Sequence, residues 1–186
     1  EALELEFNER NKRIGILIAF MAGALAITET AGDNAADDML RDTIEASDTW
    51  AFFQAKTIRM TTLRAQADGL EATTVGMKPG PALDAINKTV AAWRATADRY
   101  DSEPDTGEGR KELMARAQEV EKTRDDNAAA DATFDFASGA LQLGILLASA
   151  AVVTSLLWLA YIGAGVGAVG LVLGIMGVVA PHVFGG

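Results

Sequence analysis

The chain has 186 residues, 49% of them apolar, and a net charge of −10 at pH 7. Such an acidic surface repels phosphate backbones, so nucleic-acid binding is excluded. With no cysteine and a single histidine, a disulfide framework, a thiolate nucleophile, a Cys-based metal site and a His-paired nucleophile are excluded too. We therefore expect no enzyme activity, no cofactor and no metal.

Charge is distributed very unevenly along the chain. Residues 29–135 carry 13 Lys/Arg and 22 Asp/Glu, whereas 136–186 carry none of these four residue types. This division predicts an acidic soluble segment joined to membrane-spanning segments.

Residues 14–28, "IGILIAFMAGALAIT", form the first predicted span, after a cytoplasmic N-terminal segment, 1–13. The short apolar core and its basic lead also resemble a signal peptide. Because the lead contains several Glu residues, we interpret it as a retained anchor. It covers only about 22 Å of helix and needs flanking residues to cross the bilayer.

A helical stalk is predicted over residues 29–135. One long helix covers 37–71, a second covers 82–100, and a third begins near Arg110 and continues into the second span. Two arrangements remain open. The first helix can pair with a broken descending partner, or a break at Gly32 or Gly69 can produce a short three-helix bundle.

The long helix carries apolar side chains in two adjacent heptad rows. The first row is Met39, Thr43, Ala46, Trp50, Phe53, Thr57 and Met60, and the second is Leu40, Ile44, Ser47, Ala51 and Ile58. This face is wider than one partner helix can cover. We therefore expect a homo-oligomer with Trp50 and Phe53 in its interface.

The second and third predicted spans are residues 136–162 and 164–183, joined by a tight turn near Gly163. The third span contains a G-x-G-x-x-G pattern at 165–170, which is typical of dinucleotide-binding turns. No strand precedes it and no acidic residue follows it, so this interpretation fails.

The glycines of the third span instead recur at helical spacing. Spacings of four and three residues place them on one helix face, where they predict close helix packing in lipid. These residues are Gly163, Gly167, Gly170, Gly174 and Gly177. Further rows of small residues are Gly15, Ala19, Ala22 and Ala26 in the first span, and Ala140, Gly144, Ala148, Ala151 and Ser155 in the second. Together they predict a compact bundle.

Basic residues flank only one side of the first span. Arg10, Lys12 and Arg13 precede it, and acidic residues follow it. The positive-inside rule then places the N-terminus in the cytoplasm and the stalk outside.

Three charged residues are candidates for a functional role. Lys56 and Arg59, one helical turn apart, form either a small anion-binding spot or ordinary ion pairs on an acidic stalk, and we favour ion pairs. Glu29 either lies at membrane depth, where an ionisable group indicates function, or lies among the headgroups, which we favour.

The stretch 46–56 reads "ASDTWAFFQAK". This A-S-D-x-W-x-[FY]-[FY]-Q-A-K pattern resembles an uncharacterised family of bacterial membrane proteins catalogued only as a domain of unknown function. The resemblance extends over most of the chain and implies a bacterial inner-membrane protein; together with the orientation above, this places the stalk in the periplasm. The resemblance implies no activity, cofactor or catalytic residue.

The sequence therefore predicts an all-α membrane protein with three transmembrane helices. A long extracytoplasmic helical hairpin or small bundle lies between the first and second. We expect a non-enzymatic homo-oligomer in a structural or accessory role, with membrane lipid and other membrane proteins as further partners. The alternative is a subunit of an oligomeric channel with an acidic extracytoplasmic mouth.

Overall fold

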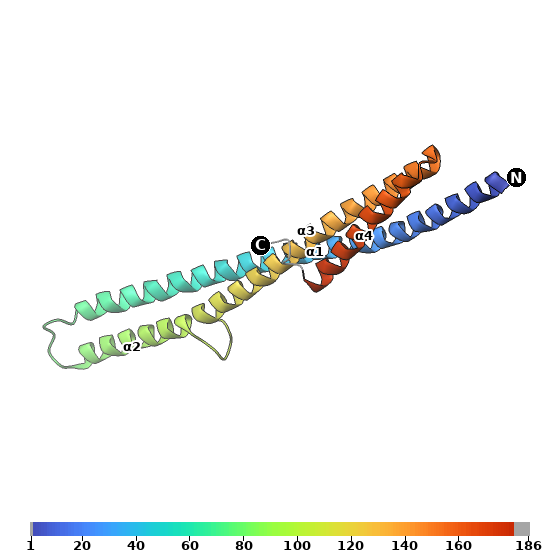
Figure 1. Ribbon diagram of the computed structural model, residues 1–186. Helices are drawn as coiled ribbons and strands as arrows, with labels where there is room; N and C mark the ends of the chain where they lie inside the picture. The colour runs from blue at the N-terminus through green and yellow to red at the C-terminus, as the bar shows by residue number, and fades with distance from the viewer. Residues whose placement is uncertain (1, 181–186) are drawn as a thin grey trace. The chain divides into compact units, whose positions relative to one another are not determined.

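A computed structural model describes residues 2–180 of the protein, with side chains from Glu9 onward. The described chain consists of four helices without any strand: α1 (Ala2–Ala72), α2 (Pro81–Asp101), α3 (Arg110–Thr154) and α4 (Leu157–Val179) (Figure 1). Helices α1, α3 and α4 are each long and apolar enough to cross a membrane. The predicted fold class, all-α with three candidate spans, is confirmed.

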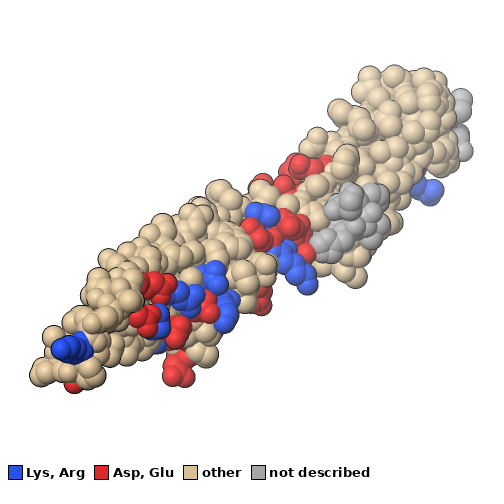
Figure 2. All heavy atoms as spheres, turned by 90° about the vertical axis from the view of Figure 1, so that its left-hand side faces the viewer, with Lys and Arg blue, Asp and Glu red and all other residues tan. Residues whose placement is uncertain are grey.

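Contacts divide the chain into two units that we describe separately. The apolar unit comprises Glu1–Arg41 and Thr123–Gly186, and the charged unit comprises Asp42–Lys122. Helices α1 and α3 contribute to both units. Figure 2 shows Lys, Arg, Asp and Glu gathered on part of the visible surface, with other stretches nearly free of charge.

In the charged unit, α1 packs against α2 and the beginning of α3. The side chains buried there include Met60 and Ala67 from α1, Val90 and Ala97 from α2, and Leu113 and Ala117 from α3. Helix α1 is not interrupted at Gly32 or Gly69. The structure thus adopts the first of the two arrangements, a continuous helix paired with a broken partner.

The break in that partner follows from local sequence. Pro81 occupies the first turn of α2, where its missing N–H costs nothing. The loop between α2 and α3 contains Gly107 at a φ of 68°, which glycine adopts without a steric penalty.

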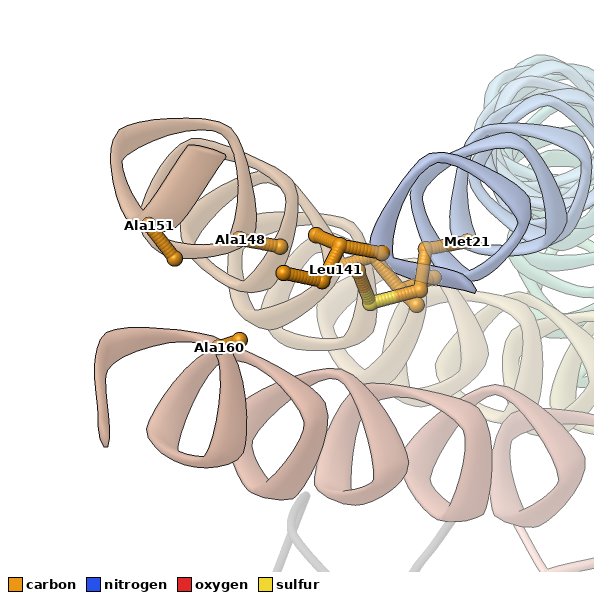
Figure 3. Close-up of a cluster of buried hydrophobic side chains, with 6 residues drawn as sticks. Met21, Leu141, Ala148, Ala151 and Ala160 are labelled. Carbon is orange, nitrogen blue, oxygen red and sulfur yellow. The ribbon is translucent and has the colours of Figure 1, made fainter. Parts of the chain in front are cut away.

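In the apolar unit, small and flexible side chains fill the space between helices. Met21 of α1, Leu141, Ala148 and Ala151 of α3, and Ala160 of α4 form a buried cluster (Figure 3). The alanines let the helices approach closely, while Met21 and Leu141 supply the bulk that fills the remaining space.

The turn between the last two helices lies earlier than predicted. Helix α3 ends at Thr154 and α4 begins at Leu157, so the expected turn near Gly163 was wrong. Val152, Val153 and Thr154 are β-branched and weaken the end of α3, and Ser155 reverses the chain at a φ of 61°. Residues 181–183 of the predicted third span lie outside the described residues.

Candidate functional site

The glycines of α4 lie on the side of the helix that packs against α3 and α1. Gly163, Gly167, Gly170 and Gly177 are buried, and Gly174 is half-buried. A methyl group on Gly163 would lie 2.8 Å from the carbonyl oxygen of Gly144, and one on Gly170 would lie 2.9 Å from that of Ala137. The α3 and α4 backbones therefore approach too closely for side chains at these positions.

Two further glycines of this face meet side chains rather than backbone. Gly167 faces the sulfur of Met21 on α1, and a methyl group on Gly177 would lie 2.8 Å from the nearest atom of the Phe134 ring. Met21 is flexible, whereas the Phe134 ring is wide and rigid. The glycine face of α4 therefore packs against both α3 and α1.

The row of small residues on α1 has the opposite orientation from that expected. Gly15, Ala19, Ala22 and Ala26 are exposed, and nothing lies within 4 Å of a methyl group placed on Gly15. Helix α1 uses its larger residues, Ile14 and Met21 among them, to contact α3 and α4. The expected role of this row in the intrachain bundle was wrong.

Trp50 and Phe53, the predicted oligomer interface, are half-buried and have partners in the same chain. Their rings meet edge to face at a centroid distance of 5.3 Å. The indole N–H of Trp50 donates to Glu121 Oε1 at 2.9 Å, and the Arg110 guanidinium lies 5.6 Å from the Phe53 ring. Their role between subunits stays a prediction.

Lys56 and Arg59 do not form one exposed basic spot. The Lys56 side chain is only 6% exposed, and its Nζ lies 3.7 Å from Glu108 Oε2. It also lies 5.2 Å and 5.1 Å from the ring centroids of Phe52 and Tyr100, a cation–π environment. Arg59 is exposed. Lys56 thus stabilises the packing of α1 against α2 and the loop that follows α2.

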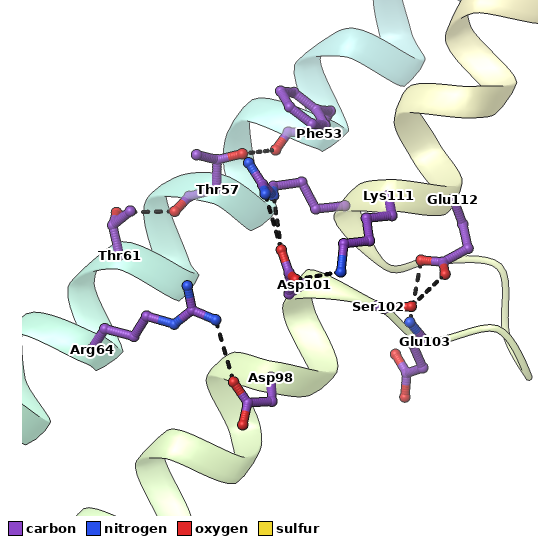
Figure 4. A network of polar contacts seen from close by, with 11 residues as sticks. Phe53, Thr57, Thr61, Arg64, Asp98, Asp101, Ser102, Glu103, Lys111 and Glu112 are labelled. Carbon is purple, nitrogen blue, oxygen red and sulfur yellow. Dashed lines mark hydrogen bonds and ion pairs between the residues drawn. The ribbon is translucent and has the colours of Figure 1, made fainter.

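A polar network fixes the loop between α2 and α3 (Figure 4). Asp101 accepts hydrogen bonds from Arg110 at 3.0 Å and 3.2 Å and pairs with Lys111 at 2.9 Å. The Lys111 hydrogen bond, with a further contribution from Arg110, lowers the pKa of Asp101. Glu112 accepts hydrogen bonds from the Ser102 hydroxyl at 2.6 Å and the Glu103 N–H at 3.2 Å, and the Ser102 hydrogen bond lowers the pKa of Glu112. These groups are structural partners of one another.

Glu29, the third charged candidate, lines a cavity of about 260 Å³ between α1 and α3. The cavity is lined by carboxylates and by hydroxyl, amide and aromatic side chains. Its polar and aromatic members are Thr28, Glu29, Asp33, Asp131, Phe134, Asp135, Ser138 and Gln142. The side-chain amide of Gln142 donates to Glu29 Oε1 at 3.2 Å. We call it the acidic cavity.

The carboxyl groups of this cavity have no countercharge from the chain nearby. Its helical segments contain no Lys or Arg from residue 14 to 40 and none after Arg124. Burial, followed by the charges of Asp135 and Asp33, raises the pKa of Asp131. No three carboxylates or histidines come close enough to hold one bare metal ion anywhere in residues 9–180.

A larger apolar groove of about 590 Å³ runs along α1 and α4 in the same unit. Thr28 and Phe134 line both spaces. Phe134 is 6% exposed and packs against Gly177 and Gly32, and a methyl group on Gly32 would lie 3.2 Å from Phe134 Cβ. Phe134 therefore forms the wall between the acidic cavity and the groove.

Sequence reasoning identified Glu29 in this cavity but not its neighbours on α3. A signal was present, because Glu29 and Asp33 on α1, and Asp131 and Asp135 on α3, are like charges four residues apart. Such pairs destabilise an isolated helix by a few tenths of a kcal/mol, and here both occur where an apolar segment begins or ends.

The fold and these features define an all-helical protein with three helices able to cross a membrane. The model of one family, the domain of unknown function DUF4337, matches residues 10–180. The chain belongs to this family. Comparison with curated proteins and with solved structures gave no match.

Proposed function

We propose that the protein is a non-enzymatic membrane protein that forms a homo-oligomer and has a structural or accessory role. Its subunits meet through the exposed apolar row of α1. One observation carries this proposal. In the charged unit, Ile44 and Ile58 of α1 are 56% and 64% exposed, and the Ala51 between them is also exposed. They belong to the second predicted heptad row, which α2 and α3 leave uncovered.

Ile44 and Ile58 lie in the charged unit, where a partner that covers them would remove water from apolar surface. Because each isoleucine is already partly covered, its complete burial by a partner would contribute about 1–2 kcal/mol. A second copy of α1 supplies a matching row, as a two-fold interface between identical chains requires. The exposed small residues at Gly15, Ala19, Ala22 and Ala26 belong to the same helix, and they allow a close approach in lipid.

We place the protein in a bacterial inner membrane with the charged unit in the periplasm. The basic residues before the first span support this orientation, and the family resemblance supports the compartment. Lipid and further membrane proteins complete the expected partners.

A change of charge on the exposed row tests the assembly. Ile44→Glu with Ile58→Glu should convert the oligomer to a monomer, because burying four carboxylates in a two-fold interface is costly. Mass is measured by light scattering in detergent and helicity by circular dichroism. The matched control is Asn87→Glu with Ala91→Glu, two exposed positions on α2, which should leave the mass unchanged.

Two results would contradict the proposal. A parent protein that is monomeric at all accessible concentrations has no assembly to explain. A variant with both substitutions that keeps the parent mass would show that subunits meet elsewhere.

A cation channel is the second candidate, and the acidic cavity at the edge of the apolar segments favours it. Most side chains turned inward in the apolar unit are Gly, Ala and larger apolar residues, with Thr28, Thr133 and Ser138 as buried polar exceptions, and this composition suits packing better than conduction. Cation flux into liposomes containing the parent protein, lost in a variant with Glu29→Gln and Asp33→Asn, would favour the channel.

A further inference from the structure

We propose that the apolar groove between α1 and α4 holds one acyl chain of a zwitterionic membrane lipid, whose headgroup carries an ammonium group. The groove is lined by residues of α1 and α4 and by Phe134 of α3, which all belong to the apolar unit. The site therefore does not depend on the assembly proposed above. Three properties of the groove support this occupant: its lining, its width and the charge beside it.

The lining of the groove suits hydrocarbon. The described lining residues are apolar except Thr28, whose hydroxyl donates to the Ala24 carbonyl at 2.9 Å. The side chains therefore offer no free polar group to water or to a polar ligand. Helices α1 and α4 are both able to cross a membrane, where lipid tails replace water around them. An unfilled void forfeits contacts on its open side, so hydrocarbon fills the groove.

The groove has a floor of small side chains and rims of large ones. Ala24, Ala31 and Gly174 line it and are half-buried. The large lining residues that are each at least 62% exposed are Phe20 and Ile27 on α1, and Ile175 and Val178 on α4. The small residues give the groove its depth, and the rims restrict the sideways movement of a chain that lies in it.

The width of the groove fits an alkyl chain rather than a helix. Its lining residues on α1 extend from Ala19 to Ala31, about 18 Å at 1.5 Å per residue. A volume of about 590 Å³ over this length corresponds to a space about 6–7 Å across. An alkyl chain is about 4 Å across, because nonbonded carbon atoms pack at about 3.5–4.0 Å. A helix with its side chains measures about 10–12 Å and is too wide to enter.

The charge beside the groove favours a particular headgroup. Thr28 and Phe134 also line the acidic cavity, so a lipid in the groove has its headgroup near carboxylates. These are Glu29, Asp33, Asp131 and Asp135. No Lys or Arg occurs from residue 14 to 40 or after Arg124 to attract an anionic headgroup. Carboxylates repel a headgroup with a net negative charge, whereas the ammonium of a zwitterionic headgroup offsets its phosphate.

The test uses the full chain in liposomes of phosphatidylethanolamine and phosphatidylglycerol with identical acyl chains. A trace of either lipid carries a photoreactive diazirine on its acyl chain, and mass spectrometry identifies the labelled residues. At low ionic strength, where charge acts most strongly, phosphatidylethanolamine should label Phe20, Ile27 and Ile175 about threefold more than phosphatidylglycerol does. Leu143 and Val153, exposed residues of α3 outside the groove, should be labelled equally by the two lipids.

A substitution that fills the groove gives a second readout. A methyl group on Gly23, which lines the groove, meets nothing within 4 Å, so Gly23→Leu adds bulk there without disturbing helix packing. It should lower the labelling of Phe20, Ile27 and Ile175 about threefold or more, because a leucine and an acyl chain exclude each other. The matched control is Gly165→Leu, at an exposed glycine of α4 outside the groove that also meets nothing within 4 Å. Its labelling should equal that of the parent, and circular dichroism verifies that both variants are folded.

Three results would overturn the proposal. Equal labelling of the groove by the two lipids would show that the headgroup is not selected. A loss of labelling in Gly23→Leu no larger than in Gly165→Leu would place the chain elsewhere. Protection of Phe20, Ile27 and Ile175 from both lipids would show that protein, such as a second copy of the chain, covers the groove instead.

Discussion

Replacing Gly170 by alanine tests whether the α3–α4 contact depends on backbone approach. The new methyl group would lie 2.8 Å from Leu141 Cγ, 2.9 Å from the Ala137 carbonyl oxygen and 3.0 Å from the Leu141 nitrogen. Nonbonded carbon atoms prefer about 3.5–4.0 Å. Because the contacts at 2.9 Å and 3.0 Å are to backbone atoms, which cannot rotate away, α4 has to move away from α3 by roughly 0.5 Å, the difference between an ordinary contact of 3.4 Å and 2.9 Å.

Two opposing effects determine how much Gly170→Ala changes the free energy of unfolding. Overpacking of this kind costs about 1–3 kcal/mol, while Gly→Ala inside a helix gains about 1 kcal/mol. Gly165 is the matched control on α4, because a methyl group there meets nothing within 4 Å. Gly165→Ala should therefore stabilise slightly, and the two variants should differ by about 1–3 kcal/mol.

Gly174 adds an intermediate case, since its nearest neighbour would be Thr28 Oγ1 at 3.3 Å. The stability of the three variants is measured by unfolding with sodium dodecyl sulfate in mixed micelles, followed by tryptophan fluorescence. The expected order of stability is Gly165→Ala, then Gly174→Ala, then Gly170→Ala. Equal stability of the Gly165 and Gly170 variants would refute the close-packing explanation.

Three further predictions concern the charged unit. Trp50→Ala with Phe53→Ala should lower the free energy of unfolding of the charged unit by about 3 kcal/mol or more, while light scattering shows an unchanged mass for the folded protein. A folded, helical monomer would instead support the predicted role of the two aromatic residues between subunits. Asp101→Asn should lower the free energy of unfolding by about 1–2 kcal/mol at neutral pH. Because the folded pKa of Asp101 is lowered, its contribution exists above the unfolded pKa of about 3.9 and is lost as pH falls through the lower folded pKa. Chemical denaturation at several pH values should therefore give parent and variant stabilities that converge in acid, and a constant difference would contradict the ion-pair explanation. Thr106 is exposed in the loop before α3, and Thr106→Cys introduces a cysteine into a sequence that has none. The new thiol should react with an impermeant maleimide on intact spheroplasts. Reaction only after lysis would invert the proposed orientation.

Helix boundaries were predictable where the chain carries a chemical signal. Pro81 and the glycine-containing loop before Arg110 indicate the ends of α2 and the beginning of α3, and both agree with the structure. No comparable signal exists between α3 and α4, because the run on both sides of Ser155 is apolar. Glycine, the usual marker of a turn, occurs at Gly163 for packing instead, and this misled the prediction.

Helix faces were harder to assign than helices. Heptad spacing places Met60 and Ile58 in neighbouring rows of α1, yet Met60 is buried and Ile58 is exposed. Periodicity identifies which residues share a face, but it does not say which face has a partner. The same limit explains Ala19 and Ala22, whose small size permits packing without requiring it.

The acidic cavity combines residues that are about a hundred positions apart in the sequence. Glu29 carries a local signal, since it borders an apolar segment. Asp131 and Asp135 come to the same cavity from α3, and their closeness to Glu29 is a tertiary property. The sequence could indicate the charge of the site, but not its shape.

Exposure of an apolar side chain has a different meaning in the two units. In the apolar unit, Phe20 and Val172 are 62% and 56% exposed, but lipid tails are as apolar as these side chains, so a partner would gain little by covering them. In the charged unit, whose surface carries many ionised groups, Ile44 and Ile58 face water at similar exposure. Removing water from them is favourable at about 25 cal/mol per Å². The exposed isoleucines of the charged unit, rather than the far larger apolar surface of the spans, therefore support an interface between subunits.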